Sequence, residues 1–114
     1  MSHSHDKAAD FERALAQAGV QKVELRLFVA GMSPRSTRAI ADLKKLCDEF
    51  LGDSCTVEIV DIYEHPAAAS EAQIIAIPTL VCDQPLPQRK LIGSISNFAK
   101  VLRTLRLVPR RPAP

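Results

Sequence analysis

The clearest alternation of apolar and polar positions along the chain lies in residues 23–29. Every second residue there is apolar, and the charged residues Glu24 and Arg26 stand between the first of them. A period of two predicts a β-strand with one well-buried face. We expect this first strand to end at Gly31.

The next apolar positions recur at helical spacing and predict a long helix. Ser33 can cap the free amides at its start, and Pro34 suits the first helical position. The apolar face of this helix comprises Ile40, Leu43, Cys47 and Phe50. We expect the helix to end at Gly52. Residues 56–62 are rich in β-branched side chains with little polar alternation, which is typical of a central parallel strand and completes a right-handed βαβ unit.

The following segment predicts a short helix and a hairpin. Pro66 opens an alanine-rich helix over residues 67–76, which must stop before Pro78 because a residue that precedes proline disfavours the helical region. Residues 79–82 and 89–92 are short strand candidates, and the turn between them is marked by prolines.

Ser96 is the expected cap of a last helix, which must end before Pro109. Its apolar face comprises Phe98, Val101, Leu102 and Leu105. The element order is therefore β-α-β-α-β-β-α, the order of the thioredoxin fold, an α/β architecture with a central mixed sheet flanked by helices. We expect this domain to span residues 22–108. Residues 1–21 would form an extension that is partly disordered or a short helix, and the proline-rich residues 109–114 a disordered tail.

Composition narrows the classes of function. A chain of 114 residues, 46% of them hydrophobic, can bury one core, and its formal charge of +2 is spread over mixed acidic and basic residues. With one Tyr and no Trp, nucleic-acid binding is not expected. The chain shows neither a signal-peptide pattern nor a membrane helix, so we expect a cytoplasmic protein. His3 and His5 are expected to be solvated tail, and no metal site is predicted.

Three cysteines, Cys47, Cys55 and Cys82, form no C-x-x-C motif and no zinc-type spacing. We expect reduced, structural thiols. Cys47 lies on the apolar helix face and Cys82 in a short strand, whereas Cys55 is placed in a turn, where it could be reactive.

The position of the thioredoxin redox site carries no dithiol. Aligning the proline of the redox motif on Pro34 puts Met32 and Arg35 where the two cysteines would stand. A methionine cannot form a mixed disulfide and an arginine cannot resolve one, so dithiol exchange is excluded at this site. Ile77-Pro78-Thr79 occupies the place of the cis-proline of thioredoxin-like folds, and we expect Pro78 to be cis.

Other catalytic patterns are missing from the sequence. It contains no G-x-S-x-G, P-loop, H-E-x-x-H or glycine-rich dinucleotide turn. His65 stands without a nucleophile in view, and Asp61 and Glu64 are interpreted as solvated acids at a strand end and a loop. We therefore expect no enzyme activity and no cofactor.

Five stretches of the chain together resemble the KaiB family. They are V-E-L-R-L-F-V-A-G at 23–31, S-P-R-S-T-R-A-I at 33–40, V-D-I at 60–62, I-I-A-I-P-T-L at 74–80 and R-K-L-I-G at 89–93. The resemblance is colinear from Val23 to about Leu107. It implies a circadian-clock component that binds the N-terminal ATPase ring of a KaiC-like ATPase, with a KaiA-like protein or a KaiB-like sensor kinase as competitor.

Two alternatives stay open: a thiol oxidoreductase of the thioredoxin superfamily, and a stand-alone KaiB-like sensor domain. For a KaiB-like regulator that binds a KaiC-like ATPase, we expect a binding surface built from the second strand, the 64–78 segment and nearby basic residues. Its candidate residues are Arg38, Val57, Glu58, Gln73, Ile74, Ile75 and Arg89. Ile74 and Ile75 could instead fill the core, and Gly31, Pro34 and Pro78 are assigned structural roles.

The resemblance also implies a second fold of the C-terminal half, which family members store in tetramers. Here Thr104 and Arg106 stand where clock members commonly carry a glycine and an acidic residue. A residue other than glycine, and a cation in the last helical turn, both favour the helix. We therefore expect the thioredoxin-like form to be the resting state, while the sequence leaves a homo-oligomer open.

Overall fold

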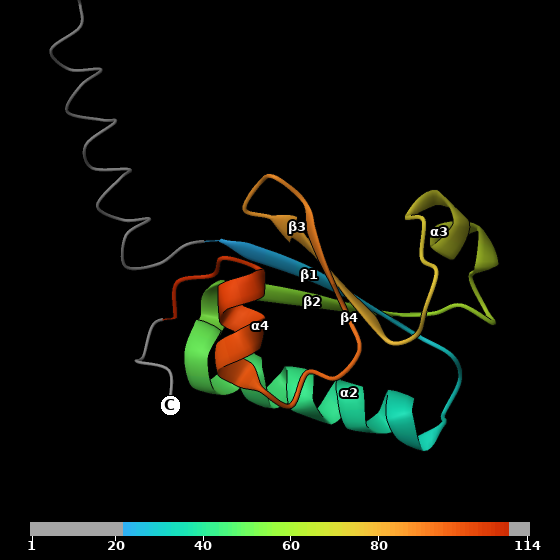
Figure 1. The fold of residues 1–114 in the computed structure, drawn as a ribbon, viewed down its shortest axis with the longest axis horizontal. Helices are drawn as coiled ribbons and strands as arrows, with labels where there is room; N and C mark the ends of the chain where they lie inside the picture. Colours follow the sequence, from blue (N-terminus) through green and yellow to red (C-terminus); the bar gives the residue numbers. More distant parts are fainter. Residues whose placement is uncertain (1–21, 110–114) are drawn as a thin grey trace, which may run out of the picture.

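The computed structural model describes residues 22–109 and confirms the order β-α-β-α-β-β-α (Figure 1). The elements are β1 (Val23–Val29), α2 (Pro34–Leu46), β2 (Cys55–Asp61), α3 (Pro66–Glu71), β3 (Thr79–Gln84), β4 (Arg89–Ile92) and α4 (Phe98–Thr104). The helix predicted within residues 1–21 and the tail from residue 110 lie outside the described residues. No helix in the described part is long and apolar enough to cross a membrane.

The four strands form one mixed sheet in the order β2-β1-β3-β4. β1 pairs in parallel with β2 and antiparallel with β3, and β3 pairs antiparallel with β4. The prediction of a central position for the second strand is therefore wrong, because β1 is central and β2 is an edge strand. β3 takes the other side of β1, which leaves β2 with one neighbour, and Thr56, Val57, Glu58 and Ile59 are exposed.

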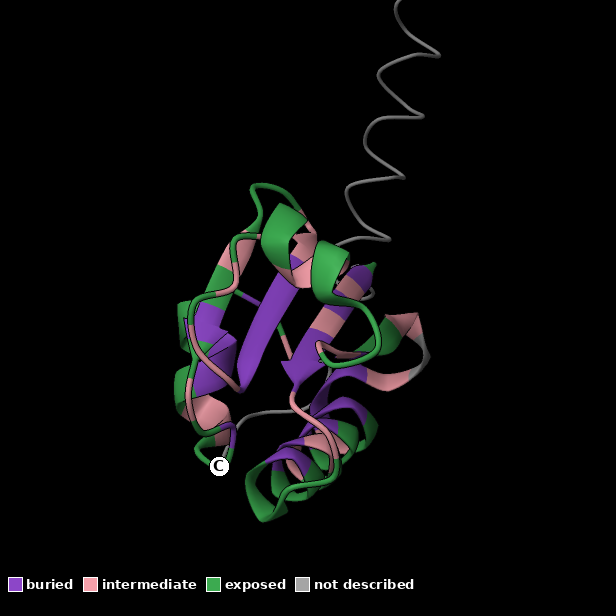
Figure 2. Ribbon diagram, turned by 90° about the vertical axis from the view of Figure 1, so that its right-hand side faces the viewer, coloured by how far each residue is buried: buried purple, intermediate pink, exposed green. Residues whose placement is uncertain are grey.

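One face of the sheet carries the main core. Alternate residues of β1 and β3, with Leu91 of β4, pack there against α2, its C-terminal extension and α4. The rings of Phe50 and Phe98 meet edge to face, with centroids 5.8 Å apart. Figure 2 shows the buried strands between exposed helix surfaces. This arrangement confirms the apolar faces that the sequence predicts for the long and the last helix.

The opposite face is only partly covered. Phe28, Val60 and Val81 form a small second cluster beneath α3 and the loops on either side of it. No residue of α3 is itself buried. The remainder of this face is therefore an open, largely polar surface.

The ends of α2 follow the sequence signals. The Ser33 hydroxyl accepts a hydrogen bond from the Ser36 amide at 3.2 Å, and Pro34 is the first helical residue, as predicted. The helix continues beyond Leu46 as a π-helical turn over Cys47–Leu51, and it ends at Gly52 with φ of 66°. Glycine suits this left-handed position because it has no Cβ.

α3 is shorter than its alanine-rich sequence predicts. It ends at Glu71, and Gln73 takes a left-handed φ of 57°. The Gln73 amide donates to the Ser70 carbonyl at 3.1 Å and the Ile74 amide to the Ala69 carbonyl at 2.9 Å. This pair of bonds is a Schellman ending. It was not predicted because glycine, its usual signal, is replaced by glutamine.

α4 differs from the prediction at both ends. Its cap is Asn97, whose side chain accepts from the Lys100 amide at 3.1 Å, and not Ser96. Thr104 is the last helical residue. Arg106 lies beyond it with φ of 55°, so Arg106 is not in the last helical turn as expected. A second Schellman ending forms here, since the Leu107 amide donates to the Leu102 carbonyl at 2.8 Å.

The peptide bond before Pro78 is cis, as predicted. The bonds before Pro85 and Pro87 in the hairpin turn are also cis, and no signal in the sequence predicts this. β3 runs two residues further than expected, to Gln84.

Candidate binding surface

The position of the thioredoxin redox site forms a shallow hollow without a thiol. Arg35, Arg38 and Asp42 of α2, the cis Pro78, and Ser94 and Ile95 line a cavity of about 290 Å³. Met32 is 82% exposed just before α2. The structure thus brings the expected elements together, with residues that cannot carry dithiol exchange at this place.

The turn after β2 is held by Asp61. Its carboxylate accepts hydrogen bonds from the Gly31 amide at 3.1 Å and the Tyr63 amide at 2.9 Å. Gly31 has φ of 64°, and a Cβ there would lie 3.3 Å from the Tyr63 ring. Asp61 therefore joins the ends of β1 and β2, and the interpretation of Asp61 as a merely solvated acid is wrong.

The segment after α3 separates the two isoleucines whose roles were left open. Ile74 packs against the Phe28 cluster together with Ile77. Ile75 is 86% exposed. The turn at Gln73 produces this division, because it ends the helix and directs neighbouring residues to different sides. Ile74 therefore supports the segment, and Ile75 is available to a partner.

The edge strand β2 presents different chemistry on its two faces. Val57 lies beside Leu25 and Ile59 beside Leu27, so both share the face covered by α2. They are 36% and 41% exposed because the helices do not fully cover the sheet edge. Glu58 lies beside Arg26 on the open face. No strand within residues 22–109 pairs with the outer edge of β2.

The basic residues are distributed differently from the prediction. Arg38 is exposed and faces Asp42 at 3.9 Å on α2. Arg89 lies opposite Cys82, at the end of the β3–β4 pair that is farther from Pro78. Its side chain is on the same face of the sheet as Leu91, which the helices cover. The structure does not bring Arg89 to α3.

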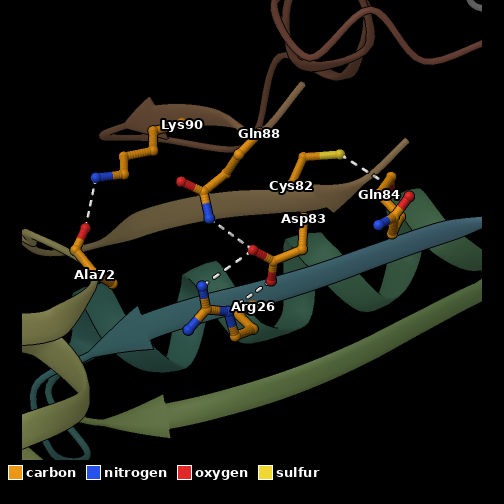
Figure 3. Close-up of polar contacts among 7 residues, drawn as sticks. All are labelled: Arg26, Ala72, Cys82, Asp83, Gln84, Gln88 and Lys90. Carbon is orange, nitrogen blue, oxygen red and sulfur yellow. Dashed lines mark hydrogen bonds and ion pairs between the residues drawn. The ribbon is translucent and has the colours of Figure 1, made fainter. Parts of the chain in front are cut away.

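Lys90 reaches the α3 segment instead, with its ammonium donating to the Ala72 carbonyl at 2.5 Å (Figure 3). Sequence reasoning missed Lys90, although it is next to Arg89. Strand geometry is the signal that could have found it, because the adjacent residues Arg89 and Lys90 must point to opposite faces and only one of them can face α3.

A polar network on the open face was also missed. The Arg26 guanidinium donates to both carboxylate oxygens of Asp83, at 2.6 and 3.0 Å, and Gln88 donates to the same carboxylate at 2.8 Å (Figure 3). Arg26 also lies 5.4 Å from the centre of the Phe28 ring. The hydrogen bond to Asp83 raises the pKa of Arg26.

Partial burial acts to raise the pKa of Asp83, but the hydrogen bonds from Arg26 and Gln88 outweigh it and hold that pKa below its usual range.

The three cysteines are free thiols, and two of them are neighbours. The Sγ atoms of Cys47 and Cys55 are 3.0 Å apart. Cys55 is the first residue of β2, not a turn residue as predicted. Cys82 is buried, and this burial raises the pKa of its thiol to about 11. Among the described residues, no cluster of His, Cys, Asp and Glu could hold a metal ion.

Comparison with known proteins identifies the family. The KaiB domain matches residues 26–107. The chain belongs to the KaiB family. It is 43% identical over 90 residues to the circadian clock protein KaiB3 of Synechocystis sp., covering 79% of this chain and 88% of that protein. It is 39% identical over 84 residues to the circadian clock oscillator protein KaiB of Microcystis aeruginosa, covering 74% and 81%.

Solved structures place the KaiB-family chain in the thioredoxin-like fold. Thioredoxin O2 from Arabidopsis thaliana superposes with a TM-score of 0.61 at 19% identity, over 85% of this chain and 87% of that one. The N-terminal domain of Synechococcus elongatus SasA gives a TM-score of 0.62 at 17% identity, over 75% and 84%. All candidate surface residues lie within the region that matches the KaiB domain.

Proposed function

We propose that this KaiB-family chain is a non-catalytic cytoplasmic regulator of a circadian or stress-timing system, which binds the N-terminal ATPase ring of a KaiC-like ATPase. Family membership supports a role in a clock. The observation that carries the proposal is the outer edge of β2, which no described strand covers. An uncovered strand edge offers main-chain donors and acceptors to a partner.

The apolar part of this surface is made of side chains that the fold leaves exposed. Val57 and Ile59 flank the strand edge, and Ile75 stands 86% exposed on the segment after α3. α3 follows β2 after a short turn and lies beyond the C-terminal end of that strand (Figure 1). Exposed apolar side chains within a polar rim are typical of the core of an interface.

The polar part of the surface comes from both faces of the sheet. Glu58 and Gln73 are exposed on β2 and after α3. Arg38 lines the hollow beside Pro78, and Lys90 lies against Ala72. Arg89 marks the far limit of this rim, so we expect Arg89→Glu to weaken binding less than Arg38→Glu. Both variants should also reduce the salt dependence of binding.

The test is the affinity of the purified chain for the purified KaiC-like ATPase of the same organism, measured by fluorescence anisotropy. Ile75→Asp should weaken binding at least ~10-fold, since loss of an interface anchor typically costs 2 kcal/mol or more. Leu86→Asp is the matched control, because Leu86 is 72% exposed in the β3–β4 turn. Equal affinities of the two variants would refute the surface, and no binding by the unaltered chain would refute the function.

The likeness to the SasA N-terminal domain supports competition with a KaiB-like sensor kinase for the same partner. A KaiA-like protein is the other expected competitor. In the anisotropy assay, adding the isolated sensor domain should displace the chain from the ATPase. Simultaneous binding of both proteins would contradict a shared site. Turnover of a disulfide substrate, abolished by removal of one cysteine, would instead favour the oxidoreductase alternative.

A further inference from the structure

Two thiols that the sequence separates by eight positions meet at one end of the sheet. Cys47 begins the π-helical turn after α2, and Cys55 is the first residue of β2. Their Sγ atoms are 3.0 Å apart, whereas a disulfide bond is about 2.05 Å long. To form the bond, the two Sγ atoms therefore need to approach each other by only about 1 Å.

The chain between the two cysteines is short and irregular. It consists of the rest of the π-helical turn, Gly52 with a left-handed φ, and a 3₁₀ turn over Gly52–Ser54. Single π-helical turns interrupt regular hydrogen bonding and occur often at functional sites. A segment of this kind can absorb a small shift of Cys47 more easily than a regular helix.

The two thiols differ in accessibility and in acidity. Cys55 is half-buried, and Cys47 is buried against the main core. The hydrogen bond with Cys55 and burial raise the pKa of Cys47. The hydrogen bond from Cys47 lowers the pKa of Cys55 against the opposing effect of burial. The more accessible thiol is thus also the one that more readily becomes a thiolate.

We propose that Cys47 and Cys55 form a redox-active pair, which a low-molecular-weight disulfide such as oxidised glutathione converts reversibly into an intramolecular disulfide. The Cys55 thiol releases its proton, and the thiolate attacks one glutathione sulfur. The S–S bond of glutathione breaks, and the first glutathione leaves and takes up a proton. Cys47 then releases its proton and attacks the Cys55 sulfur, and the second glutathione leaves as a thiol.

The balance is two protein thiols oxidised by two electrons and one small disulfide reduced to two thiols. The bond would fix the first residue of β2 to the start of the π-helical turn that extends α2. Disulfides of cytosolic proteins are usually transient and redox-sensing, which suits a pair that is free in the structure. Cys82 takes no part, because it is buried in β3 and its Sγ donates to the Gln84 carbonyl at 3.2 Å.

The experiment uses the whole purified chain in glutathione buffers of graded oxidation, without any partner protein, so its outcome is independent of the proposed function. Thiols are counted by alkylation and mass spectrometry. Digestion after glutamate cuts at Glu49 and separates Cys47 from Cys55. We expect loss of two thiols, a mass lower by two hydrogen atoms, a Cys47–Cys55 cross-linked peptide, and full recovery with dithiothreitol.

Cys82→Ser is the matched control and should close the same disulfide. Cys47→Ala should stop at a glutathione adduct on Cys55, and Cys55→Ala should leave Cys47 unmodified. The proposal is overturned if wild-type protein keeps all three thiols, stops at a glutathione adduct, or forms only intermolecular disulfides. Because the cross-linked peptide is sought in unaltered protein, a variant that fails to fold does not remove the test.

Discussion

Replacing Asp83 by asparagine tests the polar network that organises the open face of the sheet. The register of β1 against β3 shifts between Glu24 and Leu25, which leaves Asp83 without a direct partner on β1. Asp83 is two residues from Val81, the partner of Arg26, and its carboxylate contacts the Arg26 guanidinium diagonally across the two strands. Asp83→Asn keeps the size of the side chain and removes its charge.

The expected cost follows from the exposure and number of the contacts. Two hydrogen bonds from Arg26 and one from Gln88 converge on the carboxylate, and the Arg26 and Asp83 side chains are 28% and 26% exposed. Charged hydrogen bonds contribute about 1.5–3 kcal/mol when protected, whereas exposed ion pairs contribute about 0–1 kcal/mol. We expect Asp83→Asn to lower the free energy of unfolding by about 1–2 kcal/mol, a fall in Tm of roughly 5–15 °C.

The pH dependence of the stability difference between the two proteins distinguishes loss of the Asp83 charge from poor packing of the asparagine side chain. The pKa of Asp83 is lowered in the folded protein from its usual 3.8, so the carboxylate stabilises the fold above that pH. This contribution is lost as the pH falls through the depressed pKa. Urea unfolding of both proteins should therefore give a difference that is constant at neutral pH and shrinks below about pH 4.

Glu49→Gln is the control, because Glu49 faces Lys45 at 3.9 Å with both side chains well exposed, and it should cost less than about 0.5 kcal/mol. A deficit of Asp83→Asn that stays the same from pH 7 to below pH 4, or equals that of Glu49→Gln, would refute the reasoning.

Two further predictions concern backbone positions with positive φ. Arg106→Gly should raise the free energy of unfolding by about 0.5–1 kcal/mol, as measured by thermal unfolding. Glycine removes the steric strain of a side chain at positive φ, and this gain exceeds the conformational entropy that glycine adds to the unfolded chain. The control Arg103→Gly, within α4, should instead lower the free energy of unfolding by about 1 kcal/mol. Separately, helical carbon chemical shifts over residues 98–104 of the free protein should identify the thioredoxin-like fold as the resting state. Gly31→Ala should cost about 1 kcal/mol in urea unfolding, because its Cβ would be strained at φ of 64° and crowd Tyr63; an unchanged midpoint would contradict this.

Local patterns were sufficient for most elements of the fold. The alternation in residues 23–29 and the Ser33-Pro34 start signal predict β1 and α2, and both are confirmed. The place of β2 in the sheet was not predictable from its composition. A run of β-branched residues fits an edge as well as a centre, and the pairing of β3 with β1 decides between them.

The site was predicted less completely, because it depends on single-residue geometry. Arg89 and Lys90 are adjacent, but strand alternation sends them to opposite faces, and only Lys90 meets α3. Ile74 and Ile75 are divided by a left-handed Gln73 that no glycine announces. The contact between Cys47 and Cys55 depends on the π-helical turn, for which the sequence carries no known signal.

Hydrogen exchange of the backbone amides, measured for the chain alone and in complex with the KaiC-like ATPase, tests the central claim most directly. The uncovered edge of β2 and the segment around Ile75 lie on the proposed surface, and exposed backbone amides exchange readily unless a partner protects them. The account predicts slower exchange in residues 55–61 and 73–77 on binding, with the β3–β4 turn unchanged. Protection confined to the β3–β4 turn or to α4, with β2 unaffected, would contradict it.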